Sequence, residues 1–148
     1  MVSNFELVDI LLAEDSEEDA EMTIRALRKH NIGNAIHRVR DGQEALDFLN
    51  QTGMYAGCLP ARALKLMLLD LKMPKVDGIE VLRQLRASGA LDSLPVVVMT
   101  SSNEERDITE SYELGANSYV VKPIDFIQFA KTVVEVGLYW VVTNRVPG

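Results

Sequence analysis

The chain has 148 residues, of which 47% are hydrophobic and 25% charged, so it can bury one core but is too short for two ordinary domains. Its formal net charge of −7 disfavours direct binding to nucleic-acid phosphates. Cys58 is the only cysteine, which excludes an intramolecular disulfide and a cysteine-based metal site and suits a cytoplasmic location.

The first apolar segment, residues 7–13, contains Asp9 and has no basic stretch before it, unlike a secretory signal. No segment approaches the length of a membrane span. Five short apolar runs are predicted as buried strands: residues 7–13, 36–39, 66–69, 95–99 and 118–121.

Amphipathic segments between these runs predict helices. The first begins after the N-cap Ser16 and ends near Gly33. The others begin at Gly42, at Gly78, near Glu104 and near Asp125, and the last continues towards residue 142. Residues 51–65 form a long connection, and the sequence leaves open whether the preceding helix extends into it.

The strands and helices thus alternate five times along the chain. Such alternation predicts an α/β fold with a doubly wound five-stranded parallel sheet, because right-handed crossovers return the chain to the same end of the sheet. Side chains that follow the strands then share one edge.

Three carboxylates are expected at this edge. Glu14 and Asp15 follow the first predicted strand, and Asp70 follows the third. Ligands usually bind at this position in open parallel sheets. Carboxylates gathered there repel one another unless a cation offsets them, and oxygen ligands suit Mg²⁺ better than Zn²⁺.

A hydroxyl and an ammonium are expected to face these acids. Thr100 ends the fourth predicted strand and Lys122 follows the fifth. A cation, a lysine and a hydroxyl can together neutralise the oxygens of a phosphoryl group, and an aspartate can act as the nucleophile.

At the ends of successive elements, these residues resemble the signature of response regulator receiver domains, which have a flavodoxin-like (βα)5 fold. The resemblance covers nearly the whole chain, and its motif residues are Glu14, Asp15, Asp70, Thr100, Lys122 and Pro123. It implies that Asp70 is the phosphoacceptor and that Lys122 pairs with the phosphoryl group. It also implies that Mg²⁺ binds Glu14, Asp15, Asp70 and the backbone carbonyl of Lys72.

The resemblance further implies that Thr100 and Tyr119 form a switch. In the family, the threonine moves to the phosphoryl group and the aromatic residue turns inward, which remodels the face made by the fourth helix, the fifth strand and the fifth helix. Within the loop at residues 71–78, Pro74 restricts φ, and Gly78 is expected to admit conformations closed to other residues. The family pattern also implies a cis Lys122–Pro123 peptide, an isomer that the sequence itself does not show.

A narrower resemblance links the chain to single-domain regulators associated with bacterial phytochromes. It rests on residues 41–49, the long connection after them, residues 111–117 and the Tyr139–Trp140 pair. It implies that the phosphodonor is a phosphohistidine on a light-sensing histidine kinase.

The two histidines, His30 and His37, have no third imidazole or cysteine nearby and are interpreted as structural. In the last predicted helix, an apolar stripe is assigned to the core: Phe126, Phe129, Val133 and Trp140. Further apolar residues at its end predict a symmetric homodimer through the extended C-terminal helix: Leu138, Tyr139, Val141 and Val142.

The sequence therefore predicts a single receiver domain over residues 1–148. We expect it to act as a phosphoacceptor signalling protein and not as an enzyme, although it could weakly catalyse its own phosphorylation and dephosphorylation. One alternative is a degenerate receiver that binds proteins without being phosphorylated. The complete set of acids, threonine and lysine argues against this alternative. Another is an enzyme of a different α/β family, such as an aspartyl phosphatase or a flavin or dinucleotide binder. No glycine-rich loop follows the first strand, and the acids at residues 14–18 would repel a pyrophosphate.

Overall fold

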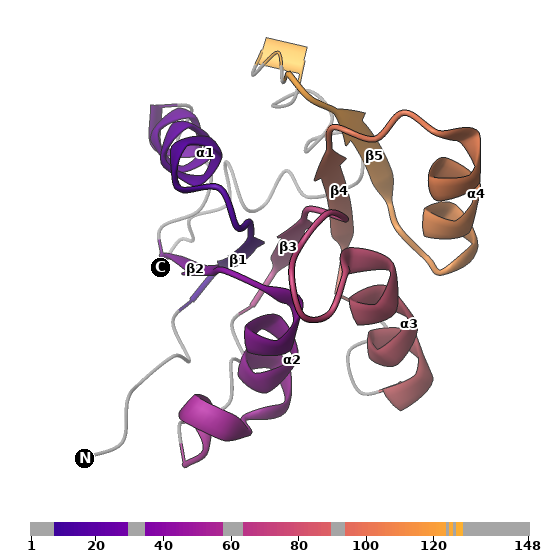
Figure 1. Cartoon of the computed structure of the whole chain (residues 1–148). Helices are drawn as coiled ribbons and strands as arrows, with labels where there is room; N and C mark the ends of the chain where they lie inside the picture. Colours follow the sequence, from indigo (N-terminus) through magenta and orange to yellow (C-terminus); the bar gives the residue numbers. More distant parts are fainter. Residues whose placement is uncertain are drawn as a thin grey trace, which may run out of the picture.

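One parallel sheet organises the part of the chain that the structure describes, namely residues 8–29, 35–57, 64–89, 94–123, 125 and 127–128. In this computed structural model the strand order is β2-β1-β3-β4-β5, and every strand is parallel to its neighbours (Figure 1). The strands are β1 (Ile10–Ala13), β2 (Ile36–Val39), β3 (Leu66–Leu69), β4 (Val96–Thr100) and β5 (Ser118–Val121). The prediction of a five-stranded parallel α/β sheet is confirmed for these residues.

Helices cover both faces of the sheet (Figure 1). Helix α1 (Glu17–Lys29) packs on one face, where Ala20 and Leu27 join a core cluster with Ile10 and Leu12. The opposite face is covered by α2 (Gly42–Asn50) and α3 (Gly78–Ser88), and α4 (Glu105–Glu113) lies next to α3 and β5. Because strand side chains alternate between the faces, Leu11 belongs to the core cluster under α2 and α3. This two-sided covering makes the fold doubly wound.

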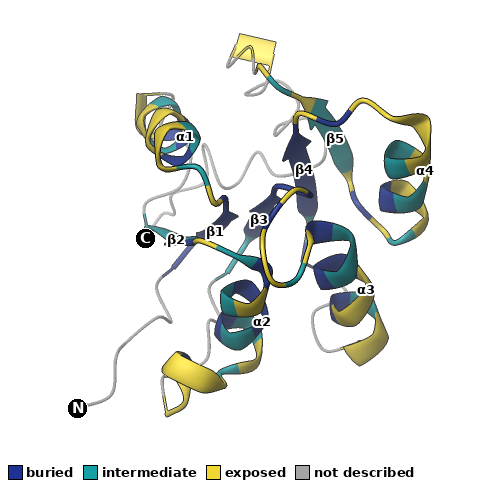
Figure 2. Cartoon of the chain, viewed as in Figure 1, coloured by how far each residue is buried: buried dark blue, intermediate teal, exposed yellow. Residues whose placement is uncertain are grey.

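The central strands are buried along their whole length, whereas the edge strands are only partly buried (Figure 2). Parallel strands covered on both faces have near-continuous apolar sequences, as in the Leu66–Leu69 run. The rigid centre of the sheet therefore carries the residues that follow β1 and β3.

Side-chain caps begin the helices close to where the sequence predicts them. The Ser16 hydroxyl accepts a hydrogen bond from the Asp19 amide at 3.2 Å, which confirms Ser16 as the N-cap of α1. Asp41 caps α2 through the Glu44 amide, and Asp77 caps α3 in the same way. These caps place helix N-termini at the edge where the predicted site lies.

Some predicted boundaries differ from the structure. Strand β4 includes Thr100 but not Pro95, because proline has no N–H to donate to a neighbouring strand. Helix α2 does not extend into the long connection, since Gln51 adopts a left-handed conformation with φ 58° and a separate 3-10 turn, η1 (Gly53–Tyr55), follows. In the predicted last helix, residue 126 and all residues beyond 128 lie outside the described residues, and with them its apolar stripe and terminal patch.

Two glycines are required by close backbone approach. A Cβ on Gly42, the first residue of α2, would lie 1.7 Å from the carbonyl oxygen of Val76 in the β3–α3 loop. A Cβ on Gly78 would lie 2.5 Å from the carbonyl oxygen of Asp70. The expectation that Gly78 adopts a conformation closed to other residues is wrong, because its φ is not positive. Both glycines instead let helix N-termini approach the loop after Asp70.

The Gly42→Ala substitution should destabilise the protein despite the higher helix propensity of alanine. The added methyl group must displace the Val76 backbone, and overpacking of this kind costs about 2 kcal/mol. Guanidinium unfolding measures the change, with Gln43→Ala, at the exposed next position, as the control. The close approach would be refuted by equal stability of the two variants.

Candidate functional site

Three carboxylates meet at the edge of the sheet where the parallel strands end. Glu14 and Asp15 follow β1, and Asp70 follows the adjacent β3. One carboxylate oxygen from each residue lies within 4.8 Å of the others. Glu14 and Asp70 are buried, whereas Asp15 is exposed. The structure therefore brings together the acids that the sequence places at this edge, in a pocket with an open side.

Lys122 points into this acidic pocket from the end of β5. Its Nζ donates to Glu14 Oε1 at 2.5 Å and to Asp70 Oδ2 at 3.1 Å. It also donates to Asp19 Oδ2 at 2.9 Å, a contact that the sequence analysis missed. The signal was present, because Asp19 lies in the first turn of α1, four residues after Asp15. One ammonium thus bridges a carboxylate of α1 and the carboxylates that follow β1 and β3.

The electrostatics of the pocket reflect this crowding. Burial raises the pKa of Glu14 to about 7; the hydrogen bond from Lys122 opposes the rise and the nearby Asp70 carboxylate adds to it. Burial alone would lower the pKa of Lys122, but the hydrogen bonds to Glu14 and Asp19 and the charge of Asp70 raise it overall. Lys122 therefore stays charged, and the carboxylates around it still carry excess negative charge.

A hard divalent cation fits this donor set. All three candidate ligands are carboxylates, which Mg²⁺ and Mn²⁺ accept. Opposite ligands of Mg²⁺ lie about 4.2 Å apart, close to the spread of these oxygens. The Lys72 amide donates to Asp70 Oδ1 at 3.1 Å, which holds the start of the loop beside the acids. The role of the Lys72 carbonyl as a ligand stays a prediction.

Thr100 and Tyr119 lie in a hydrogen-bond network next to the pocket. The buried Thr100 hydroxyl accepts from the Ser102 amide at 3.4 Å, and the Tyr119 hydroxyl donates to the Ser102 carbonyl at 2.9 Å. The Ser102 hydroxyl donates to Asp107 of α4 at 2.6 Å. Ser102 thereby connects the two predicted switch residues to α4.

Two other expectations concern the Lys122–Pro123 peptide and the histidines. The Lys122–Pro123 peptide is cis, as the family resemblance implies. His37 stacks on Phe48 and its Nε2 lies 2.7 Å from the Tyr55 hydroxyl, which agrees with a structural role. His30 lies outside the described residues.

Among the helices that the structure describes, none combines the length and hydropathy needed to cross a lipid bilayer.

Comparisons with known proteins agree with this geometry. Residues 10–134 match the family model of the response regulator receiver domain. The bacteriophytochrome response regulator RtBRR is 46% identical, with a TM-score of 0.81 over 99% of this chain and 85% of that chain. A second bacteriophytochrome response regulator, AtBRR, is 48% identical, with a TM-score of 0.76 over 94% of this chain and 99% of that chain.

A cyanobacterial protein is also similar. Response regulator Rcp1 of Synechocystis sp. is 37% identical over 93% of this chain and 92% of its own length. The crystal structure of the Mn²⁺-bound form of Rcp1 has a TM-score of 0.76 to this structure, at 36% identity, and covers 95% of this chain and 99% of that one. From the family match and these likenesses, the chain belongs to the response regulator receiver domain family and resembles its single-domain, phytochrome-associated members.

Proposed function

We propose that the protein is a two-component response regulator in which Asp70 accepts a phosphoryl group in a Mg²⁺-dependent reaction. The observation that carries the proposal is the convergence of Glu14, Asp15 and Asp70 with the Lys122 ammonium in one pocket. In the transfer, a carboxylate oxygen of Asp70 forms a bond to phosphorus while the P–N bond of a phosphohistidine breaks. The electron pair of that bond stays on the departing imidazole nitrogen.

The residues of the chain have distinct tasks in this reaction. Mg²⁺ held by the three carboxylates would supply positive charge against the phosphoryl oxygens. Lys122 already contacts Asp70 Oδ2 and supplies a second positive charge to the incoming group. The Lys72 amide holds Asp70 Oδ1 and so fixes the orientation of the nucleophile. Positioning and charge neutralisation are the main needs of phosphoryl transfer, and this pocket offers both.

The proposed output is a change in the face formed by α4 and β5. Thr100 would bond the phosphoryl group. Because Thr100 and Tyr119 both hydrogen-bond to the Ser102 backbone, and the Ser102 hydroxyl bonds to Asp107, Ser102 would transmit the change to α4. Tyr112 of α4 and Val121 of β5 are large exposed apolar residues, which suits a surface for protein binding. Phosphorylation would act by shifting the population of two arrangements of this face.

The proposed donor is the phosphohistidine of a light-sensing histidine kinase. The proposed location is the cytoplasm, where the protein would meet this kinase. Support comes from the similarity to response regulators named for bacteriophytochromes. Because residues 129–148 lie outside the described residues, both the single domain over residues 1–148 and the homodimer through its C-terminal helix stay predictions.

Metal removal tests the central claim. After incubation with acetyl phosphate and MgCl₂, intact-mass spectrometry should show one added phosphoryl group, and peptide mapping should locate it on Asp70. With EDTA in place of MgCl₂ the mass should not change, because the pocket then lacks the charge that offsets the phosphoryl oxygens. Adding excess MgCl₂ back to the same sample should restore labelling, which controls for damage by the chelator.

Two outcomes would contradict this proposal. Equal labelling with and without the metal would remove the role of the acidic pocket. The second outcome is a folded sample that is labelled neither by acetyl phosphate under any condition nor by a histidine kinase. It would favour the alternative function, a scaffold that binds proteins without phosphorylation.

A further inference from the structure

Arg38 occupies an unusual position for a charged residue. It lies on β2, and its side chain is only 10% exposed. Strand residues two apart face the same side, so Arg38 faces α1 as Ile36 does, and Ile36 packs against the apolar core there. An apolar side chain is the ordinary choice at such a place.

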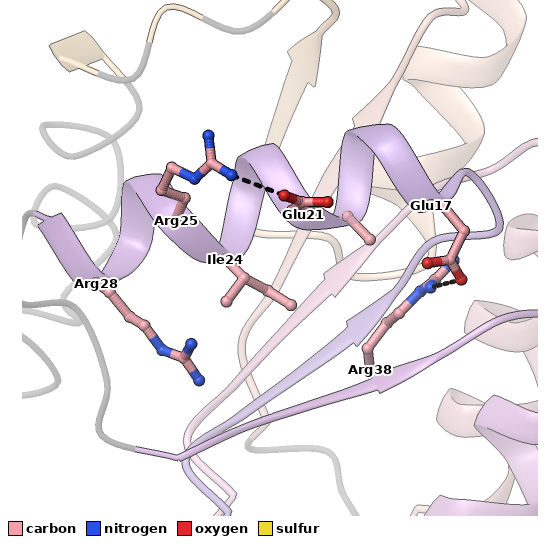
Figure 3. Close-up of a pocket in the computed structure, with 7 residues that line it drawn as sticks. Glu17, Glu21, Ile24, Arg25, Arg28 and Arg38 are labelled. Atoms are coloured by element: carbon pink, nitrogen blue, oxygen red, sulfur yellow. Dashed lines mark hydrogen bonds and ion pairs between the residues drawn. The ribbon is translucent and has the colours of Figure 1, made fainter.

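The guanidinium of Arg38 bonds to both ends of the loop between β1 and α1. Its Nε donates to the carbonyl oxygen of Glu14 at 2.9 Å. Its Nη1 donates to Oε1 of Glu17, the first residue of α1, at 2.6 Å (Figure 3). Because the guanidinium is planar and rigid, it links the backbone at the end of the strand to a side chain of the first helical turn in one geometry. Asp15 lies between the two bonded residues.

The third nitrogen of this guanidinium, Nη2, is buried and has no hydrogen-bond partner within the described chain. A buried donor without a partner is unfavourable, so this site does not satisfy arginine fully. The two bonds to the loop are thus the feature that distinguishes arginine from an apolar residue of similar size here.

We propose that Arg38 is a positioning residue for the cation site and holds Glu14 and Asp15 in their binding arrangement. The inference rests on the proposed Mg²⁺-dependent function. The Glu14 backbone is held from β2 on two sides, since its amide donates to the Val39 carbonyl at 3.0 Å and its carbonyl accepts from Arg38. Groups that orient metal ligands from behind commonly change metal affinity when they are removed.

Calorimetric titration with MgCl₂ tests this role in the full chain. The Arg38→Met variant should bind Mg²⁺ about tenfold more weakly than the wild type. The MgCl₂ concentration that gives half-maximal phosphorylation by acetyl phosphate should rise by the same factor, because the weakened step is the binding of the cation. A residue that served only the stability of the fold would not change the affinity of the folded protein for Mg²⁺.

Arg40→Met is the matched control. Arg40 also contacts Glu17, at 3.2 Å, but its side chain is 61% exposed and it makes no bond to the Glu14 carbonyl. This variant removes the same charge from the same strand end, and it should bind Mg²⁺ with wild-type affinity. An equal loss in both variants would indicate a general charge effect and overturn the inference.

A second pair of variants covers the case in which Arg38→Met does not fold. Arg38→Lys keeps the charge but cannot bond both loop ends with one rigid group, so its affinity should also fall. Glu17→Gln, at a side chain that is 75% exposed, should weaken binding less. Wild-type affinity in Arg38→Lys would overturn the inference while leaving the proposed function intact. Absence of Mg²⁺ binding by the wild type would instead overturn the proposed function.

Discussion

Replacement of Asp70 with asparagine is expected to abolish Mg²⁺-dependent phosphorylation and to leave the fold intact. The amide has nearly the shape of the carboxylate, but it lacks the negative charge of the nucleophile and of the metal ligand. Intact-mass spectrometry after incubation with acetyl phosphate and MgCl₂ should therefore show no added phosphoryl group at times when the wild type is fully labelled.

The same substitution should not lower stability in metal-free buffer. The Asp70 carboxylate contributes to the raised pKa of Glu14, so its removal relieves repulsion between two buried acids. Lys122 loses one ion pair but keeps those with Glu14 and Asp19. Thermal unfolding in EDTA should give a midpoint equal to or above that of the wild type. Asp125→Asn, an exposed aspartate outside the pocket, is the control and should be labelled normally. Phosphorylation of Asp70→Asn at the wild-type rate would show that another residue is the acceptor.

Replacement of Lys122 with methionine should have the largest effect on stability. The buried carboxylates of Glu14 and Asp70 then lose the ammonium that contacts both of them. Removal of one partner from a buried ion pair lowers the free energy of unfolding by about 3–5 kcal/mol. We expect a loss of about 3 kcal/mol, because Glu14 can take up a proton once the lysine is gone. Urea unfolding in EDTA measures this change. Addition of MgCl₂ should recover part of it, because the cation offsets the same carboxylates.

Lys75→Met provides a matched control for this experiment. Lys75 also lies near an aspartate, with its Nζ 3.6 Å from Asp41, but its side chain is 69% exposed. Surface ion pairs of this kind contribute about 0–1 kcal/mol. If both lysine variants lost the same small amount of stability, the bridging role of Lys122 would be refuted.

Much of the site could be predicted because it depends on where strands end. Once the sheet is known to be parallel, residues that follow its strands must share one edge. Glu14 and Asp70 meet because β1 and β3 are neighbours, and Lys122 reaches them from β5 by its long side chain. The bounds of β2, β3 and β5 were equally accessible, since buried parallel strands have short apolar runs that turn residues separate, whereas β1 begins later than predicted and β4 is shifted by one residue.

Other features depended on how closely particular elements approach and could not be read from local patterns. Arg38 looks like an exposed charge until α1 is placed over β2. Gly42 looks like an ordinary helix start, and only the packing of α2 against the Val76 carbonyl shows why a side chain is excluded. Asp19 joins the pocket because the first turn of α1 brings it within reach of Lys122. Such distances arise from tertiary packing, which sequence periodicity does not encode.

The bridge made by Lys122 also has a consequence for the order of folding. The ammonium joins residues that are 108, 103 and 52 positions away along the chain. Contacts of such long range form late, because the entropy of closing the intervening loops must first be overcome. A nascent chain emerging from the ribosome would expose its acidic residues before the lysine is available to them. Competence for the proposed phosphorylation should therefore appear only after β5 has docked, because incompletely folded molecules lack the lysine that assists the transfer.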